Sequence, residues 1–489
     1  MAWISTFYLR ELKHKPAHSG GSLRVHPENL LAAASNRCHT GICAPSHKRC
    51  ARSSQGNPLR DINRASTFRR DPTMPLGFYI IMAAQFFSAL ADNALLIIAI
   101  AMLRDMAAPS EYEPLLKLFF TVSYVALAAF VGAFADSMPK WRVMLISNTI
   151  KIGGCLMLFL GTHPLFAYAV IGLGAAAYSP AKYGILTEYL PHRLLVVANG
   201  WIEGLTVAAI IVGTVIGGIM IRGDVSTWLM GLGLPGAGSA FGAAVLVVGT
   251  LYLVAAIFNM YIPDTGVDHK PLKSNPLYLL HDFNHCLRLL WRDKLGQISL
   301  AVTTLFWGAG ATLQFIVIKW AEHNLGMNLS QASMLQGVVA LGVATGAVLA
   351  ARYITLRRAV NVIPLGIAMG LGVMIMVGVT EAWVAMALMV IVGGLAGFFV
   401  VPMNALLQHR GHILMGAGHS IAVQNFNENL SILMMTGTYA LLIVLGLSIN
   451  TVIVLFGLFV AGTMLLVKRR HEANQREFDN VALLEDRPH

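Results

Sequence analysis

The sequence predicts an all-α polytopic membrane protein in which twelve transmembrane helices form two pseudo-symmetric bundles of six. Three observations support this prediction. The 489-residue chain is 56% hydrophobic and only 12% charged, whereas soluble domains are about 25% charged. From Gly77 onward, apolar runs near the length that a bilayer crossing needs, about 20 residues, follow one another. The two halves of the chain also resemble each other at an offset of about 220 residues.

The chain begins with a basic polar segment, residues 1–73, which holds 12 Lys and Arg residues against four acidic ones. It lacks the continuous apolar core of about 7–15 residues that a signal peptide needs. Cys38, Cys43 and Cys50 lie in it at a spacing that matches no standard zinc pattern. We expect a disordered extension, with Met74 as the true start of translation.

Residues 74–467 contain the predicted membrane spans. They are expected near 77–103, 115–135, 143–162, 164–187, 194–221, 239–262, 296–320, 333–353, 361–379, 382–407, 419–445 and 447–467. This gives an N-terminal bundle (74–262), a central loop (263–294), a C-terminal bundle (295–467) and a tail (468–489). The loop is polar and contains three prolines, and its end, 279–291, has the pattern of an amphipathic helix at a membrane surface.

The basic residues predict the orientation of the spans. One set of connections carries most of them: Lys140, Arg142, Arg193, the block 270–294, Arg352, Arg357, Arg358, Arg410 and 468–470. The alternate set is mainly acidic. An even number of spans puts both termini on one side, and the positive-inside rule makes that side cytoplasmic. The net charge of +11 therefore indicates orientation, and we expect no nucleic-acid partner.

An internal repeat relates the two halves. The stretch 172–182 aligns with 394–404, and 199–206 aligns with 424–431, so that Glu203 corresponds to Glu428. A duplicated six-helix unit around a long central loop is typical of a secondary transporter with its site between the halves.

A loop motif follows the second span. Residues 132–142, GAFADSMPKWR, resemble the major facilitator signature G-x-x-x-D-(R/K)-x-G-(R/K)-(R/K), with Ser137 and Pro139 as departures. Gly132 would permit close helix approach, and Asp136 would cap a helix or form an ion pair across the cytoplasmic interface and hold one state closed. Lys140 and Arg142 supply the basic positions. The alternative is a charged loop that only sets orientation.

Polar and charged residues inside the predicted spans are the candidate site. A charge near the bilayer midplane costs at least about 2.5–3.5 kcal/mol, so it is usually functional. We expect a polar cavity lined by Gln85, Asp92, Asn93, Asn148, Lys151, Tyr178, Lys182, Glu203, Gln314, Asn404, Gln424, Asn425 and Glu428. For the Asn and Gln residues, hydrogen bonding between packed helices explains the pattern equally well.

Motifs for chemistry are absent from the sequence. It has no Gly-Lys dipeptide and therefore no Walker A loop, and no G-x-S-x-G or H-E-x-x-H. We therefore expect a transporter that is not an enzyme and needs no cofactor or metal.

Several strings narrow the class of transporter: QFFSALADNALL at 85–96, GAAAYSPAKYGIL at 174–186, FWGAG at 306–310, VPMNALLQ at 401–408 and IAVQN at 421–425. From about residue 76 onward the chain resembles the bacterial lysophospholipid transporters of the major facilitator superfamily. One departure is Gln314, where that family carries a basic residue. If that basic residue pairs with the acid at Asp92, this protein must use another partner, such as Lys151 or Lys182.

The resemblance implies a bacterial inner-membrane flippase. It would move lysophospholipids, especially lysophosphatidylethanolamine, from the outer to the inner leaflet by alternating access, for re-acylation by a cytoplasmic acyltransferase/acyl-carrier-protein synthetase. Asp92 or Glu203 would meet the ammonium group, and Lys151 or Lys182 the phosphate. Two alternatives stay open: a proton-coupled exporter of drugs or metabolites, and a non-transporting membrane scaffold for a lipid enzyme.

Overall fold

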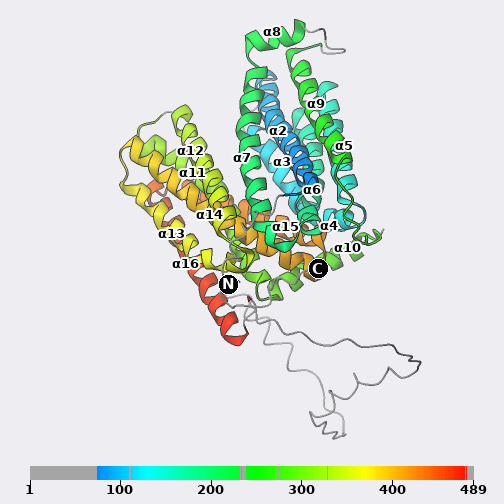
Figure 1. Cartoon of the computed structure of the whole chain (residues 1–489). Helices are drawn as coiled ribbons and strands as arrows, with labels where there is room; N and C mark the ends of the chain where they lie inside the picture. Colours follow the sequence, from blue (N-terminus) through cyan, green and yellow to red (C-terminus); the bar gives the residue numbers. More distant parts are fainter. Residues whose placement is uncertain are drawn as a thin grey trace, which may run out of the picture. The chain divides into compact units, whose positions relative to one another are not determined.

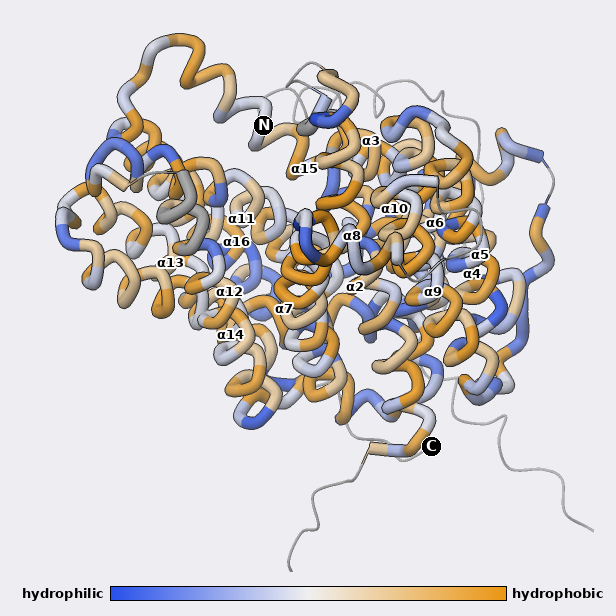
Figure 2. The backbone as a smooth tube through the Cα atoms, turned by 90° about the horizontal axis from the view of Figure 1, so that it is seen from above, coloured by the Kyte–Doolittle hydropathy of each residue, from blue (hydrophilic) through white to orange (hydrophobic). Residues whose placement is uncertain are grey.

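The computed structural model describes residues 74–108, 112–231, 233, 238–273, 275–327, 329–478 and 481. The expected N-terminal extension, 1–73, lies outside the described residues, and so do the three cysteines within it. The described part is helical, and helices with apolar residues along most of their length dominate it (Figure 2).

The first half of the described chain forms one group of helices (Figure 1). Its elements are α2 (Leu76–Asp105), α3 (Tyr112–Ala126), α4 (Ala128–Asp136), α5 (Lys140–Phe159), α6 (Pro164–Tyr189), η2 (His192–Leu194), α7 (Leu195–Met220), α8 (Gly223–Gly231) and α9 (Ala240–Met260).

The second half forms another group. Its elements are α10 (Pro276–Arg292), α11 (Gly296–Asn324), α12 (Leu329–Tyr353), η3 (Leu356–Val362), α13 (Ile363–Met374), η4 (Ile375–Gly378), α14 (Ala382–Met415), α15 (Ala417–Val444) and α16 (Ile449–Glu477).

All twelve predicted spans coincide with helical segments. Within the described residues, ten segments are long and apolar enough to cross a bilayer, and α3 with α4 makes an eleventh that bends by 65°. The twelfth, α15, has the length of a span, but its first half is too polar, because it carries Gln424, Asn425 and Glu428. We had not predicted α8, and the sequence gives no sign of the bend between α3 and α4.

The amphipathic segment in the central loop is a helix, as its pattern predicts, but it begins three residues earlier. Asn275 precedes α10 and its side chain accepts a hydrogen bond from the backbone N–H of Leu277, while Pro276 occupies the first turn. Both are favoured helix starters. Leu279, Phe283 and Leu290 lie on the buried face of α10.

The predicted internal repeat is reflected in the matching positions of two prolines within helices. Pro180 lies inside α6 and Pro402 inside α14, at corresponding positions of the two halves. The two groups meet at the end of the molecule where α10 lies, the α10 end, and diverge toward the opposite end, where α8 lies (Figure 1).

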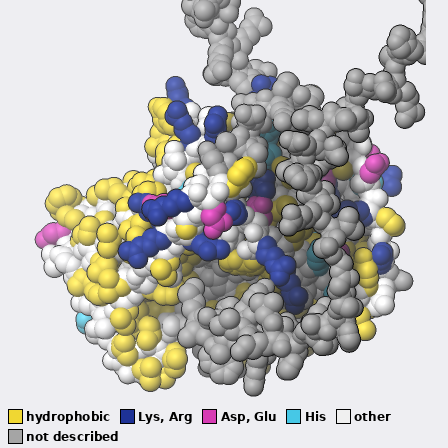
Figure 3. Space-filling model, turned by 90° about the horizontal axis from the view of Figure 1, so that it is seen from below, with side chains coloured by type: hydrophobic (Ala, Val, Ile, Leu, Met, Phe, Trp, Pro, Cys, Tyr) yellow, Lys and Arg dark blue, Asp and Glu magenta, His cyan; other side chains and the backbone are white. Residues whose placement is uncertain are grey.

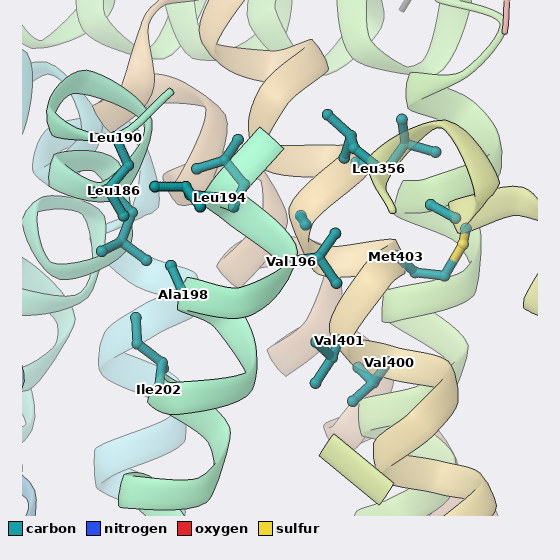
Figure 4. Close-up of a cluster of buried hydrophobic side chains, with 14 of the residues drawn as sticks. Leu186, Leu190, Leu194, Val196, Ala198, Ile202, Leu356, Val400, Val401 and Met403 are labelled. Carbon is teal, nitrogen blue, oxygen red and sulfur yellow. The ribbon is translucent and has the colours of Figure 1, made fainter. Parts of the chain in front are cut away.

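An apolar cluster joins the two halves near the α10 end. It combines Ala198 and Ile202 of α7 with Val400, Val401 and Met403 of α14 (Figure 4). Inside a bilayer, close packing of such side chains, rather than exclusion of water, favours the association of helices. This cluster closes the space between the halves on that side.

Candidate functional site

A cavity of about 420 Å³ lies between the two halves of the protein. This volume falls within the usual range for small-molecule sites. Residues from α2, α3, α5, α6, α7, α11, α14 and α15 line it. Nine of the thirteen predicted cavity residues are among them: Gln85, Asp92, Lys151, Tyr178, Lys182, Asn404, Gln424, Asn425 and Glu428.

An ion pair stands on the wall that the first half contributes. Lys151 Nζ of α5 lies 2.8 Å from Asp92 Oδ2 of α2. Lys151 also donates to the hydroxyl of Ser88 at 3.0 Å, and the hydroxyl of Tyr252 donates to Asp92 Oδ1 at 2.6 Å. Because Gln314 cannot supply a charge, Lys151 is the partner of Asp92, one of the two that the sequence suggested.

The other lysine of the cavity is available for a ligand. Lys182 Nζ lies 4.6 Å from the centre of the Tyr183 ring, a cation–π contact. No carboxylate lies within 4 Å of it among the described residues. It sits half-buried two residues after Pro180 in α6.

A row of amides and carboxylates crosses between the halves. Asn404 of α14 donates to Glu203 Oε1 of α7 at 3.4 Å. Gln424 of α15 then donates to the side-chain oxygen of Asn404 at 3.1 Å and to Glu428 Oε1 at 2.7 Å. The two carboxylates that the repeat relates are thus joined through two amides, and neither has a cationic partner within 4 Å in the part of the chain described.

Three buried polar atoms at the cavity have no hydrogen-bond partner among the described residues. They are the hydroxyl of Tyr178 and the side-chain oxygens of Gln85 and Gln424. Buried polar groups nearly always have partners, so unpaired ones at a cavity wall indicate a polar ligand or water. Together with Lys182 and Glu428 they offer donors and acceptors to a zwitterion.

Four predicted residues do not line the cavity. Glu203 lies directly behind Asn404, and Asn148 accepts a hydrogen bond from Ser88 at 2.8 Å behind the wall. Asn93 donates to the backbone of Ala89 within its own helix. Gln314 lines a separate pocket inside the second half; it lies on nearly the same face of α11 as the cavity residue Trp307, but two turns farther along the helix.

The loop motif makes contacts across the α10 end. Asp136 Oδ1 accepts from the backbone N–H of Gly418 at 2.7 Å, and Oδ2 accepts from that of His419 at 3.0 Å. The carboxylate therefore caps the N-terminus of α15, where the helix dipole favours negative charge. A Cβ at Gly132 would lie 2.8 Å from the Cβ of Ala422, so the glycine permits this approach.

The basic residues of the motif behave differently from each other. Lys140 Nζ lies 2.8 Å from Asp136 Oδ1 and 3.0 Å from Glu188 Oε1, and its side chain is buried. Arg142 is exposed and lies 5.1 Å from the Trp141 ring, outside the network.

Several residues that form contacts between helices of the two halves were not identified from the sequence. His419 Nδ1 lies 2.6 Å from Asp136 Oδ2, and its Nε2 lies 3.2 Å from Asp282 Oδ2 of α10. The helix of the central loop therefore also contacts the N-terminus of α15 at this end. Asn199 and Gln408 exchange two hydrogen bonds of 2.9 Å across the halves. The repeat alignment had included Asn199, but only as part of a pattern.

The described ranges contain two cysteines, both buried. Cys155 and Cys286 are free thiols there, and no group of three His, Cys, Asp or Glu residues could hold a metal ion within the same ranges.

Comparisons with known proteins agree with this architecture. Residues 81–426 match the family model described as Major Facilitator Superfamily. The chain is 40% identical to the lysophospholipid transporter LplT of Yersinia enterocolitica serotype O:8 / biotype 1B, over 77% of this chain and 90% of that protein. It is 41% identical to the protein of the same name from Yersinia pestis strain Pestoides F, over 77% of this chain and 89% of that one.

Solved structures share the fold at low sequence identity. The human organic anion transporter MFSD10 superposes with a TM-score of 0.63 at 14% identity, over 81% of this chain and all of that one. The transporter FucP in its outward conformation gives 0.62 at 13% identity, over 81% of this chain and 98% of that one.

Proposed function

This chain belongs to the Major Facilitator Superfamily and, within it, to the family of lysophospholipid transporters, and from that premise we propose that it moves lysophospholipids across a bilayer by alternating access. The single observation that supports this best is the cavity between the halves. It holds a free lysine, a carboxylate without a cation and unpaired amide oxygens, inside a multi-pass membrane protein. A zwitterionic headgroup complements such a wall.

The headgroup would use the groups that the protein leaves unpaired. Asp92 is already bound to Lys151 and Tyr252, so we assign the ammonium group to Glu428 with the side-chain oxygen of Gln424. The phosphate goes to Lys182 and the hydroxyl of Tyr178. Charge-assisted hydrogen bonds of this kind are about twice as strong as neutral ones.

The direction of transport and its setting are part of the same proposal. We place the α10 end at the cytoplasmic side of a bacterial inner membrane, because Lys and Arg side chains gather across its described surface (Figure 3). Lysophosphatidylethanolamine would enter from the outer leaflet and leave into the inner one, where a cytoplasmic acyltransferase/acyl-carrier-protein synthetase would re-acylate it. The contacts of Asp136 with α15 would hold the cytoplasmic side closed until the headgroup is bound.

Purified protein in liposomes tests the transport proposal. Fluorescent lysophosphatidylethanolamine is added outside, and the fraction protected from extraction by albumin is followed with time. The wild type is expected to protect it much faster than empty liposomes. Lys182→Gln and Glu428→Gln should each slow uptake by about tenfold, the equivalent of about 1.4 kcal/mol.

Lys319→Gln is the matched control, because the side chain of Lys319 is 61% exposed and pairs with Glu322 at the end of α11. Its uptake should equal that of the wild type. A wild type that moves no lysolipid would leave the scaffold alternative standing. Normal uptake by Lys182→Gln would refute the phosphate assignment alone.

A second candidate function has one observation in its favour. Glu203 and Glu428 are buried without a cationic partner among the described residues, and such carboxylates carry protons in coupled transporters. A proton-coupled exporter would lose transport with an uncoupler and show no preference for lipids in the same liposomes.

A further inference from the structure

A second, apolar pocket lies inside the C-terminal half, beside the polar cavity. It has a volume of about 120 Å³ and is enclosed by α11, α12, α13, α14 and α16. Among the described residues that line it, Gln314 and Gln336 carry polar side chains. Gln336 donates to the backbone oxygen of Gln314 at 3.0 Å, so its amide is already engaged. The described residues of this wall include no charged side chain.

Consecutive residues of α11 connect the two spaces. Phe306 lines the apolar pocket and Trp307 lines the polar cavity, and their rings meet edge to face at 5.5 Å. From Phe306 the wall continues through Gly310, Leu313 and Val317, which follow one stripe of the helix. The polar cavity and the apolar pocket therefore adjoin each other at consecutive residues of α11.

Polar and apolar lining are separated between spaces rather than between halves, since Glu428 of the C-terminal half also lines the polar cavity and the N-terminal half has an apolar pocket of its own. The charged residues Asp92, Lys151 and Lys182 belong to the N-terminal half, and both apolar pockets of α11 belong to the C-terminal half. Buried apolar cavities of this size stay dry and bind apolar groups. An occupant that reaches the pocket from the polar cavity must have a charged end and a hydrocarbon end.

We propose that this apolar pocket, which adjoins the polar cavity at Phe306 and Trp307, receives the end of the single acyl chain of the transported lysolipid. The inference rests on the proposed function and adds the site at which the acyl chain of the lysolipid binds. The stripe from Phe306 to Val317 rises about 16 Å along α11, away from the α10 end. A lysolipid bound in this way already points its headgroup toward the α10 end and its chain the other way, which is the orientation it has after flipping.

The chain-length dependence of uptake tests the proposal. A Cβ at Gly310 would meet nothing within 4 Å, so Gly310→Leu can begin a side chain there and place it in the pocket. With lysophosphatidylethanolamines of 10 to 18 carbons in liposomes, this variant should lower the ratio of long-chain to short-chain uptake at least fivefold. Leu313→Ala enlarges the pocket and should shift the preference toward longer chains, so the test stands even where one variant folds poorly.

Thr438→Leu is the control, because Thr438 lines the neighbouring apolar pocket between α11, α15 and α16. Its chain-length ratio should equal that of the wild type. Unchanged ratios in both Gly310→Leu and Leu313→Ala, with normal wild-type uptake, would overturn this inference and leave the proposed function intact. A wild type that moves no lysolipid of any length would overturn both.

A photoreactive chain separates the lysolipid from ordinary membrane lipid as the occupant. A lysophosphatidylethanolamine with a diazirine at its terminal carbon should label peptides of α11 and α14 in wild-type protein, and Gly310→Leu should suppress the labelling. Equal labelling by a diacyl phosphatidylethanolamine with the same diazirine would assign the pocket to bulk lipid and overturn the proposal.

Discussion

At the scale of single residues, the ion pair of Asp92 and Lys151 is the feature whose removal should be most costly. The side chain of Lys151 is 2% exposed and that of Asp92 19%. Breaking a buried pair by removing one partner leaves an uncompensated charge and destabilises by about 3–5 kcal/mol. Asp92→Asn should therefore lower the midpoint of thermal unfolding in detergent markedly, and Asp92→Asn combined with Lys151→Met should recover part of the loss.

An exposed pair supplies the comparison for that measurement. Arg222 and Asp224 lie 3.6 Å apart with side chains 68% and 70% exposed, and such pairs contribute about 0–1 kcal/mol. Arg222→Gln should leave the unfolding midpoint almost unchanged. If Asp92→Asn unfolds like Arg222→Gln, the buried pair does not stabilise the fold.

Residue identity predicted which side chains matter better than it predicted their partners. Asp92, Lys151 and Lys182 stood out because a charge within an apolar span needs a reason, and all three line the cavity. Tyr252 could not be found in this way, since tyrosine occurs in apolar helices without any polar role. Gln314 was misplaced because it lies two turns along α11 from the cavity residue Trp307, in a separate pocket, and how far a cavity extends along a span depends on the packing of the other helices.

At the scale of elements, the N-terminus of α15 packs against Asp136 at the α10 end, where we expect it to control opening. A Cβ at Gly418 would lie 2.6 Å from Asp136 Oδ1 and 2.7 Å from the backbone oxygen of Gly132. Gly418→Ala should therefore push α15 away from α4 and favour the state open at this end. Spin labels on Arg142→Cys and Arg358→Cys, which are exposed on different halves, should show an added population at longer distance.

The same helix provides the control. A Cβ at Gly437 of α15 would meet nothing within 4 Å, so Gly437→Ala should give the distance distribution of the unsubstituted protein. Identical distributions for Gly418→Ala and Gly437→Ala would show that close packing at Asp136 does not hold this end closed.

The spans could be predicted because length and apolarity define most of them; α15 has the length of a span and an apolar second half, although its first half is polar. The exception is α8, which the sequence reading left in a connection, because its nine residues carry Asp224 and Ser226 and resemble a loop. The bend of 65° between α3 and α4 arises at Leu127, where neither proline nor glycine gives a warning.

At the scale of the whole molecule, the internal repeat predicted two facing bundles but not how unlike their linings are. Repetition fixes the backbone arrangement, including the matched prolines at 180 and 402. It does not fix chemistry: the N-terminal half supplies Asp92, Lys151 and Lys182 to the polar cavity, while the C-terminal half supplies Glu428 and amides.

The orientation of the whole molecule gives the last prediction. Asp224 of α8 and Arg358 of η3 are exposed at opposite ends, and the free thiols of Cys155 and Cys286 are buried and react little. With the cysteines at 38, 43 and 50 changed to serine, a membrane-impermeant maleimide should label Asp224→Cys in intact spheroplasts. Arg358→Cys should react only after permeabilisation, because the positive-inside rule keeps its basic connection in the cytoplasm. The reverse pattern would invert the molecule, and the proposed import of lysolipid would then have to be read as export.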